Sequence, residues 1–380
     1  MARDASLLAR AFQEAERAGW LLTAPNPRVG ALALLDGHVV GHGHHAACGL
    51  AHAEEAALRD AGAWDETADH PIPGRVDEMV VSLEPCSSEG GGKRRRPCAA
   101  RLLEAGVKRV VVGAGDPDPR HRGAGLAKLR EAGVEVVEAG EDERFAAQNP
   151  AFLAALAAPS RPFTVLKWAA TLDGRTATRS MASQWITGPA ARAEVQRLRA
   201  VSDGVLVGPG TLTVDQPRLD ARTLPEDPLQ RQPVRLFWGA ARAAAAGKGP
   251  GTVPGPRWWL ESEERLPEAA DDEDRCLLVP AGALGGLDAG AAMARLHEEG
   301  IRRILVEGGS RLQGRLLAAG LVDAVVRYEA PSLFGGGLGC LEAEGVEEPA
   351  QAWRLRAEER LDLGPDLRRA FLLDAGGAPA

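Results

Sequence analysis

The first part of the chain shows a regular alternation of apolar strands and amphipathic helices. Residues 5–18 carry apolar side chains at helical spacing, and residues 29–35 and 38–41 form two strands around Asp36-Gly37, a strong hairpin signal. The helices and strands expected after this hairpin are 53–63, 78–83, 97–105, 107–112, 126–132 and 134–137. This order predicts a mixed sheet with helices on both faces.

A second series of strands and helices follows a helical stretch over 141–157. The sequence Ala-Pro-Ser-Arg-Pro at 158–162 marks the expected boundary, which predicts domains over 1–158 and 159–380. The strands expected beyond it are 164–170, 204–207, 234–238, 276–279, 303–306 and 324–329, with helices at 189–200, 290–299 and 310–319. The pattern predicts a second α/β domain. Segment 240–256 is rich in Ala, Gly and Pro, which predicts a surface loop insertion.

Composition narrows the class of protein. Hydrophobic residues make up 45% and charged residues 26% of the chain, as in ordinary globular proteins. The net charge of −8 argues against general binding to nucleic acid or an anionic membrane, but allows a local basic pocket for a phosphate. The N-terminus mixes acids and bases and lacks an apolar signal core, so we expect a cytoplasmic protein. The sequence leaves open whether the chain forms a homo-oligomer.

Four residues carry the strongest chemical pattern. His52 and Glu54 lie at a helix start, Cys86 follows a strand, and Cys98 begins the next helix. One His and two Cys suffice for a catalytic zinc (Zn²⁺) that keeps its fourth position for water. Zinc lowers the pKa of such a water to about 7, and a nearby glutamate can carry its proton, as in nucleobase deaminases. The alternative is that the cysteines are small buried apolar residues and His52 a histidine at a helix start.

The remaining histidines and cysteines carry weaker signals. His42, His44 and His45 cluster at the hairpin exit, where a loop contact to substrate, or no role, is favoured over a second metal site. The five cysteines are an odd, sparse set and do not indicate a disulfide framework. Three of them, Cys48, Cys276 and Cys340, are expected to be packing residues.

The motifs PNPRVGALAL (25–34), AHAEEAAL (51–58), SLEPCS (82–87) and PC (97–98) add a family resemblance. They resemble the deaminase domain of the bifunctional riboflavin-biosynthesis deaminase/reductase family. The resemblance implies a cytidine-deaminase-like α/β/α sandwich, in which Asn26 binds the pyrimidine edge and His45 the ribose phosphate. The wide spacing of the two cysteines is a trait of that family. The longer loop after Cys86 leaves open which of Lys93 and Arg94–Arg96 contacts substrate.

The second half lacks the G-x-G-x-x-G pattern of an ordinary Rossmann site. Two short glycine loops follow strands instead, at 208–211 and 307–310, and the second opens a helix whose N–H groups could bind a phosphate. Taken alone, each loop is best interpreted as a plain turn.

The strings LKWAATLDGRTAT (166–178), SQWITG (183–188), VLVGPGTLTVDQPRLDAR (205–222) and ILVEGGSRLQG (304–314) are more specific. They resemble the reductase domain of the same family, which implies a dihydrofolate-reductase-like α/β fold and NADPH as cofactor. The implied NADPH contacts are Ala169, Trp185, Thr211, Asp215, Gly309, Ser310, Arg311, Leu312, Gln313, Gly314 and Arg315. The implied substrate contacts are Ser183, Arg199, Leu219, Arg222 and Glu307, with Lys167 and Asp173 shaping the same cleft. Gly239, Ser332 and Gln216 depart from the family pattern.

The resemblance implies two consecutive reactions on a small phosphoribosylaminopyrimidine. The first removes an amino group from the pyrimidine, and the second reduces the ribosyl group with NADPH. Glu307 is a candidate proton donor by location alone. Three alternatives stay open: a deaminase with a degenerate reductase domain, a deaminase of another substrate with an unrelated second domain, and a binding module with a structural zinc. The last would need four protein ligands, and the sequence offers three convincing ones.

Overall fold

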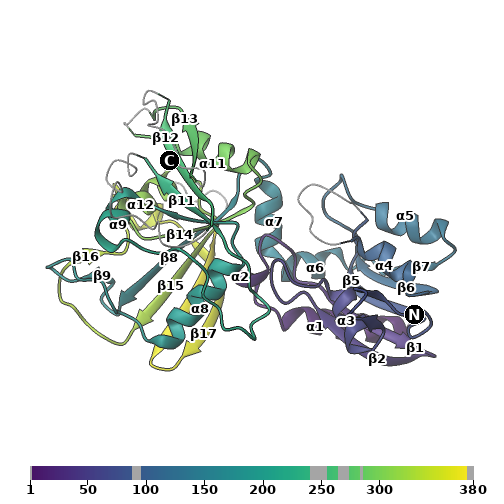
Figure 1. The fold of residues 1–380 in the computed structure, drawn as a ribbon. Helices are drawn as coiled ribbons and strands as arrows, with labels where there is room; N and C mark the ends of the chain where they lie inside the picture. The colour runs from purple at the N-terminus through teal and green to yellow at the C-terminus, as the bar shows by residue number, and fades with distance from the viewer. Residues whose placement is uncertain (1, 88–95, 240–254, 264–273, 283–285, 375–380) are drawn as a thin grey trace. The chain divides into compact units, whose positions relative to one another are not determined.

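The computed structural model describes residues 2–87, 96–239, 255–263, 274–282 and 286–374. The chain divides into two compact units, Met1–Leu156 and Ala157–Ala380, here named the N-terminal and C-terminal domains (Figure 1). Most of the expected insertion, 240–254, lies outside the described residues. Among the described residues, no helix has the length and apolar character needed to span a membrane.

The N-terminal domain contains the expected mixed sheet, with strand order β2-β1-β5-β6-β7. The strands are β1 (Gly30–Leu35), β2 (His38–His44), β5 (Glu78–Leu83), β6 (Arg109–Ala114) and β7 (Glu135–Glu138). Strand β1 runs antiparallel to β2 and β5, and β5, β6 and β7 run parallel to one another. The short strands β3 (Trp64–Asp65) and β4 (His70–Pro71) form a separate pair.

Helices cover both faces of this sheet. Helix α1 (Ala2–Glu16) packs Leu7, Leu8 and Ala11 on one face, and the opposite face is covered by α3 (Ala53–Asp60), α4 (Cys98–Glu104) and α5 (Ala124–Glu131). Gly43 of β2 lets α3 approach closely, because a Cβ there would lie 2.2 Å from the carbonyl oxygen of Ala53. The short helix α2 (Trp20–Thr23) lies between α1 and β1 in the chain. The domain is therefore an α/β/α sandwich.

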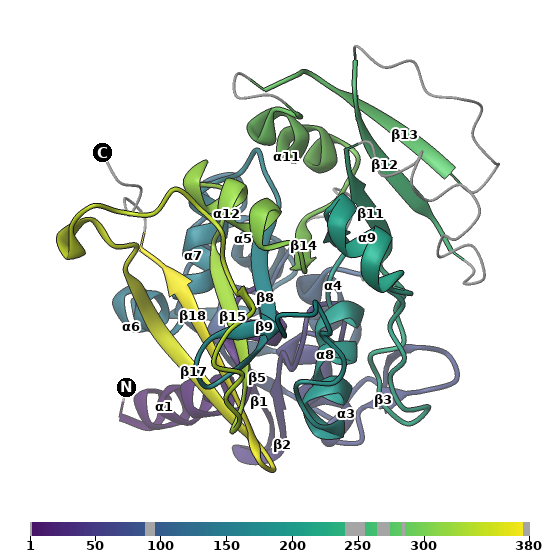
Figure 2. The ribbon, with the colours of Figure 1, turned by 90° about the vertical axis from the view of Figure 1, so that its left-hand side faces the viewer.

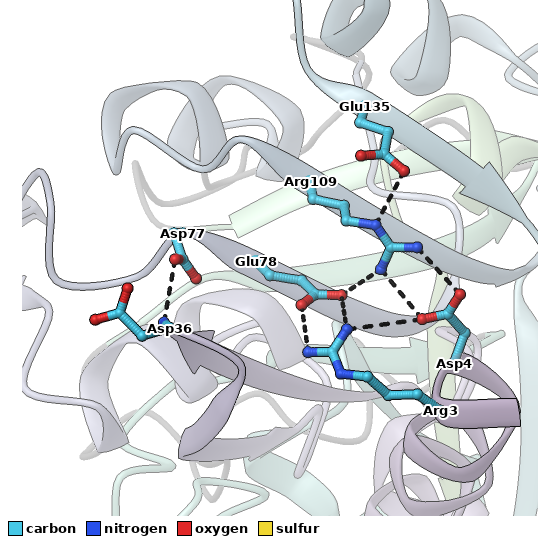
Figure 3. A network of polar contacts seen from close by, with 7 residues as sticks. All are labelled: Arg3, Asp4, Asp36, Asp77, Glu78, Arg109 and Glu135. Carbon is cyan, nitrogen blue, oxygen red and sulfur yellow. Dashed lines mark hydrogen bonds and ion pairs between the residues drawn. The ribbon is translucent and has the colours of Figure 1, made fainter. Parts of the chain in front are cut away.

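A network of ion pairs joins the elements that begin at one end of this sandwich (Figure 3). The Arg109 guanidinium bonds Asp4 of α1 at 3.1 Å, Glu135 of β7 at 3.0 Å and Glu78 of β5, and Arg3 also bonds Glu78. Hydrogen bonds from Arg109 lower the pKa of Asp4. These residues lie where α1, β5, β6 and β7 begin, so the network orders the sheet at the end where β5 starts.

The C-terminal domain is built on a nine-stranded sheet with order β13-β12-β11-β10-β14-β8-β15-β18-β17. The strands are β8 (Phe163–Thr171), β10 (Gly204–Val207), β11 (Val234–Trp238), β12 (Arg257–Ser262), β13 (Asp274–Val279), β14 (Arg303–Glu307), β15 (Ala324–Ala330), β17 (Leu355–Leu363) and β18 (Asp366–Leu373). All are parallel from β13 to β15, and β18 is antiparallel to both of its neighbours. In Figure 2, β17 and β18 form the yellow edge and β13 the green edge.

The helices of this domain lie on both faces of its sheet. Helices α11 (Ala289–Glu298) and α12 (Ser310–Ala318) share an apolar core with inward-facing residues of the central strands. Helix α8 (Pro189–Ala200) lies on the other face, where the buried Tyr328 hydroxyl donates to Glu194. Glu194 also accepts from Arg368 of β18 at 2.8 Å. The remaining elements are α9 (Pro209–Asp215), a 3-10 turn (Pro349–Gln351), β9 (Arg175–Ala177) and β16 (Leu338–Gly339).

Some elements differ from the sequence prediction. The helix expected over 141–157 is divided into α6 (Asp142–Gln148) and α7 (Pro150–Ala157), because Pro150 has no N–H and disfavours helical geometry at Asn149. Strands β12, β17 and β18 were not predicted. Strand β17 is largely exposed, and β18 buries Asp366 and Arg368 where an apolar pattern would be expected.

Candidate active sites

Three side chains from separate segments of the N-terminal domain meet at one point. His52 caps α3, Cys98 is the first residue of α4, and Cys86 lies in the loop after β5. The His52 Nδ1 atom lies 3.3 Å from Cys98 Sγ and 3.8 Å from Cys86 Sγ. All three ligand atoms lie within 4.8 Å of one another, which fits a metal ion held by one nitrogen and two sulfurs.

Cys86 is held in place by its neighbours in the loop. The carboxylate of Glu84, only 6% exposed, accepts hydrogen bonds from the N–H groups of Gly123 at 2.8 Å and Gly125 at 2.9 Å. The Lys128 ammonium donates to the Ser87 carbonyl at 2.8 Å. Sequence reasoning missed Glu84, although a carboxylate at the end of an apolar strand and next to Pro-Cys was a usable signal.

The electrostatics of this cluster suit a zinc site. Hydrogen bonds from the Cys98 thiol and from His52 lower the pKa of Cys86 to about 3, and the resulting thiolate is the form that binds metals. The pKa of Cys98 is raised by the neighbouring Cys86. Glu54 is buried, which raises its pKa, and it shares a hydrogen bond with Cys98. A protonatable carboxyl group therefore lies beside the donor set without belonging to it.

Asn26 and His45 lie beside the same cluster. The His45 ring contacts that of His52 edge-on, with 5.4 Å between their centroids. Its Nδ1 donates to the carbonyl of Ala51 at 3.0 Å, and its Nε2 lies 3.2 Å from Asn26 Nδ2. The Asn26 amide also lies 3.9 Å from Cys48 Sγ, so Cys48 borders the site rather than packing far from it.

His42 and His44 do not join this group. The His42 Nδ1 atom lies 3.2 Å from Glu14 of α1, and burial together with Arg17 lowers the pKa of His44. Within the described part of the chain, the metal-ligand cluster consists of His52, Cys86 and Cys98. Among the residues that the structure describes, His42, His44 and His45 belong to no second metal-ligand cluster. Residues 88–95, which hold Lys93, Arg94 and Arg95 of the expected substrate loop, lie outside the described residues.

The loop that carries Asn26 is anchored by Asn149, which the sequence reasoning did not single out. The Arg28 N–H donates to Asn149 Oδ1 at 2.7 Å, and Asn149 Nδ2 donates back to the Arg28 carbonyl at 3.2 Å. Asn149 is 2% exposed and also donates to the carbonyl of Phe145. The break between α6 and α7 therefore places a side chain that fixes residues 25–29.

In the C-terminal domain, a buried carboxylate joins two of the predicted substrate residues. Glu307, at the end of β14, accepts from Arg199 of α8 at 2.5 and 2.9 Å and from Lys167 of β8 at 3.3 Å. Burial opposes its ionisation, but Arg199 and Lys167 hold its pKa at about 2. Glu307 is therefore ionised at neutral pH, which does not suit a proton donor, and its two cationic neighbours are Arg199 and Lys167.

The two glycine loops lie against each other. A Cβ at Gly308 would lie 2.7 Å from Thr211 Oγ1, and Gly309 has a φ of +80°, which favours glycine. The Ser183 hydroxyl donates to Asp215 at 3.0 Å, at the end of α9. The structure thus brings together predicted cofactor and substrate residues that are far apart in sequence.

Other predicted residues have mainly internal contacts. Gln313 is 1% exposed and donates to the carbonyls of Lys167 and Val306, and the Leu219 side chain is fully buried. Ser310 and Arg311 both bond the carboxylate of Glu342, and the backbone carbonyl of Glu342 packs against Gly314. Asp173 accepts hydrogen bonds from the Thr171 hydroxyl and from the N–H groups of Phe334 and Gly335. Trp185 is 70% exposed, and the Arg192 guanidinium lies over its ring. Ala169 is half-buried on β8, Leu312 is buried, and Arg315 lies near Gly286.

The Arg222 side chain is half-exposed and is linked through Asp220 to the buried ion pair of Arg199 and Glu307. Its guanidinium bonds Asp220 at 3.0 Å, and Arg218 bonds the other oxygen of Asp220 at 2.8 Å. The Asp220 carbonyl accepts in turn from Arg199 at 3.0 Å. Asp220 therefore connects three arginines near Glu307.

Comparisons with known proteins identify the family of both domains. Residues 1–114 match the cytidine and deoxycytidylate deaminase zinc-binding region, and residues 162–367 match the RibD C-terminal domain. The riboflavin biosynthesis protein RibD of Escherichia coli is 37% identical, with 96% of this chain and 98% of that protein covered. The chain belongs to the RibD family. The RibD relative from Aquifex aeolicus is 34% identical over 91% of this chain and 92% of its own length.

A solved RibD structure extends this result to the fold. Acinetobacter baumannii RibD has a TM-score of 0.68 and 31% identity, with 98% of this chain and 99% of that chain covered. As in the RibD family, the chain is a bifunctional enzyme with a zinc-binding deaminase domain and a dihydrofolate-reductase-like domain that uses NADPH. The interpretations as a binding module and as a deaminase with an unrelated second domain are therefore excluded.

The charged group around Glu307 predicts a pH-dependent stability. Because the folded pKa of about 2 lies below the usual 4.5, the ion pairs stabilise the domain above pH 4.5 and are lost as pH falls toward 2. We expect Glu307→Gln to lower stability at pH 7 by about 3 kcal/mol, with a difference from wild type that shrinks between pH 4.5 and 2. Urea unfolding followed by tryptophan fluorescence measures this difference.

The matched control is Glu298→Gln, which removes the exposed pair with Arg295 and should change stability little at any pH. A difference between Glu307→Gln and wild type that stays constant, or grows, as pH falls to 2 would contradict the assigned ionisation of Glu307.

Proposed function

We propose that the chain deaminates 2,5-diamino-6-(5-phosphoribosylamino)pyrimidin-4(3H)-one at carbon 2 and then reduces the ribosyl group of 5-amino-6-(5-phosphoribosylamino)uracil to ribityl. The observation that carries the proposal is the His52, Cys86 and Cys98 cluster, with Glu54 bonded to Cys98 but outside the donor set. A solved Thermotoga maritima protein, 28% identical over 98% of this chain with a TM-score of 0.68, is described as a diaminohydroxyphosphoribosylaminopyrimidine deaminase/5-amino-6-(5-phosphoribosylamino)uracil reductase.

In the first reaction, water adds to carbon 2 and the amino group leaves as ammonia. His52, Cys86 and Cys98 would hold a zinc ion, which would lower the pKa of a water bound to it to about 7. The Glu54 carboxylate accepts a proton from the water and delivers it to the ring nitrogen. It then carries the proton of the new hydroxyl group on carbon 2 to the leaving amine, and the carbonyl group forms. Burial of Glu54 supports this role, because the raised pKa of its carboxyl group favours taking up a proton.

Asn26 and His45 are proposed to hold the first substrate. The Asn26 amide offers both a donor and an acceptor for the pyrimidine edge. The His45 ring, which Ala51 and Asn26 orient, is proposed to contact the ribose phosphate. The His45 ring packs against that of His52 and the Asn26 amide contacts His45, which supports placing the substrate on this side of the metal ligands.

In the second reaction, the ring of the ribose opens between C1′ and its ring oxygen, and C1′ is reduced. NADPH, when bound along the glycine loops, supplies the hydride that C1′ receives. The ring oxygen must gain a proton as its bond to C1′ breaks. Lys167 is the proposed donor, because Glu307 is ionised and holds the ammonium in place at 3.3 Å.

The phosphate of the second substrate is assigned to Arg222 with Arg199. Guanidinium groups bind phosphate with two parallel hydrogen bonds, which suits the half-exposed Arg222. Ser183, Asp173 and the backbone at Leu219 are proposed to complete the substrate site. We also propose that the enzyme works in the cytoplasm on small molecules, without nucleic acid or membrane partners, which agrees with its net charge of −8.

Glu54→Gln tests the deaminase mechanism. The substitution keeps the size of the side chain but removes the carboxylate that moves the proton, so ammonia release should fall by at least about 10²-fold. Zinc content should stay at the wild-type level, and NADPH oxidation on pre-deaminated substrate should also be unchanged. Ammonia release near the wild-type rate would contradict the role of Glu54.

Arg222→Ala tests the phosphate contact in the reductase site. Loss of a charge-assisted hydrogen bond to phosphate should raise the KM for the deaminated substrate by about 10-fold or more and leave ammonia release unchanged. Arg218→Ala is the matched control, because Arg218 bonds the same Asp220 carboxylate but is not proposed to contact substrate. Equal effects of the two substitutions on KM would contradict the assignment.

A further inference from the structure

A buried charged cluster joins the two helices that carry metal ligands. The Glu55 side chain of α3 is fully buried and accepts hydrogen bonds from two arginines. Arg101 of α4, whose side chain is 5% exposed, bonds one carboxylate oxygen. Arg59 of α3 bonds the other oxygen at 3.0 Å from its own helix. Only the first of these two contacts crosses from one helix to the other.

The ion pair between Glu55 and Arg101 lies about one helical turn from each of the metal ligands His52 and Cys98. Glu55 comes three residues after His52, and Arg101 comes three residues after Cys98. His52 and Cys98 must approach within metal-binding distance, and their Nδ1 and Sγ atoms are 3.3 Å apart. A bond between Glu55 and Arg101 therefore restrains the distance between the two helix starts at nearly the same level as the ligands.

Trp64 holds the arginine of this bridge. The Arg59 guanidinium lies 4.6 Å and that of Arg101 5.0 Å from the centroid of the buried Trp64 ring. Contacts between a cation and an aromatic face at these distances are attractive. Arg101 is thus fixed by both a carboxylate and an aromatic ring, which limits the positions that its side chain can adopt.

Stability alone does not explain a buried ion pair at this place. Removing two charges from water is costly, and well-packed apolar residues in the same volume are often as stabilising. What a charged, directional contact adds is a defined distance and orientation between two helices. Partners outside the ligand shell often orient metal ligands in this way, and their loss weakens metal binding by about 10–100-fold.

We propose that Glu55 and Arg101 are a positioning pair that sets the spacing of His52 and Cys98, and so the affinity and geometry of the zinc site. Neither residue belongs to the metal-ligand cluster, so their proposed role is to position the ligands. The inference rests on the proposed ligand set. Zinc binding by the wild-type protein tests that set separately.

The test compares Arg101→Met with Arg59→Met in the full-length protein. Each substitution removes the bonding to Glu55 and one contact with Trp64. Arg59→Met also removes ion pairs with the exposed Glu66 and Asp69, but only Arg101→Met breaks the connection to α4. Competition with a chelator measures zinc affinity, and the visible spectrum of the cobalt-substituted protein reports the geometry of the ligands. We expect Arg101→Met to weaken zinc binding by about 10–100-fold and to change the cobalt spectrum. Arg59→Met should leave both near wild type.

A double variant keeps the test informative if the unpaired Glu55 carboxylate disturbs folding. Glu55→Met with Arg101→Met removes both charges and fills the space with apolar side chains, so the domain should fold. Circular dichroism checks this, and zinc affinity should still be reduced. Wild-type affinity and cobalt spectrum in the double variant, or equal losses in the Arg59→Met and Arg101→Met proteins, would overturn the proposal. Failure of the wild-type protein to bind zinc would instead overturn the ligand set.

Discussion

In the N-terminal domain, one nitrogen and two sulfur atoms from three separate segments have to meet within 4.8 Å, and the surrounding fold is arranged to bring them there. Two of the ligands lie at helix starts, where the backbone direction is fixed by the packing of α3 and α4 on the sheet. The third lies in a loop that Glu84 fastens to the start of α5. Because Glu54 follows His52 by half a turn, the same constraint that forms the metal site also places the proton carrier.

In the C-terminal domain, buried ion pairs rather than metal ligands keep separate elements in their relative positions. A carboxylate at the end of a central strand is buried, and two cations from different elements compensate it. The cost of burying Glu307 is offset only while Arg199 and Lys167 stay in place, so β14, β8 and α8 must keep their relative positions. The cluster thus holds Lys167 beside the end of β14, where the glycine loops at 208–211 and 307–310 meet.

The local patterns in the sequence were sufficient for much of this architecture. The hairpin at Asp36-Gly37, the helix starts at His52 and Cys98, and the strand before Cys86 could all be predicted, because each depends on neighbouring residues. The edge hairpin β17–β18 was missed because its strands expose one side and bury Arg368 with Glu194 and Glu359, which no periodic apolar pattern records.

Residues that support the sites were harder to find than residues within them. Glu84 and Asn149 act through hydrogen bonds to backbone groups 39 and 121 residues away, so no pattern of neighbouring residues identifies their partners. The sequence analysis did not single out Glu55, because a glutamate in the first turn of a helix gives no sign of a partner as distant as Arg101. The two glycine loops had no individual specificity, and their significance comes from their meeting at Thr211.

The central claim is that one chain performs a zinc-dependent deamination and an NADPH-dependent reduction at two separate sites. A coupled assay of the purified full-length protein tests it most directly, following ammonia release and NADPH oxidation on the diaminopyrimidine substrate with and without a chelator. The account predicts that both signals appear without chelator. Zinc removal should abolish ammonia release and leave NADPH oxidation on pre-deaminated substrate intact. Ammonia release that survives complete zinc removal, or no NADPH oxidation on pre-deaminated substrate, would contradict it.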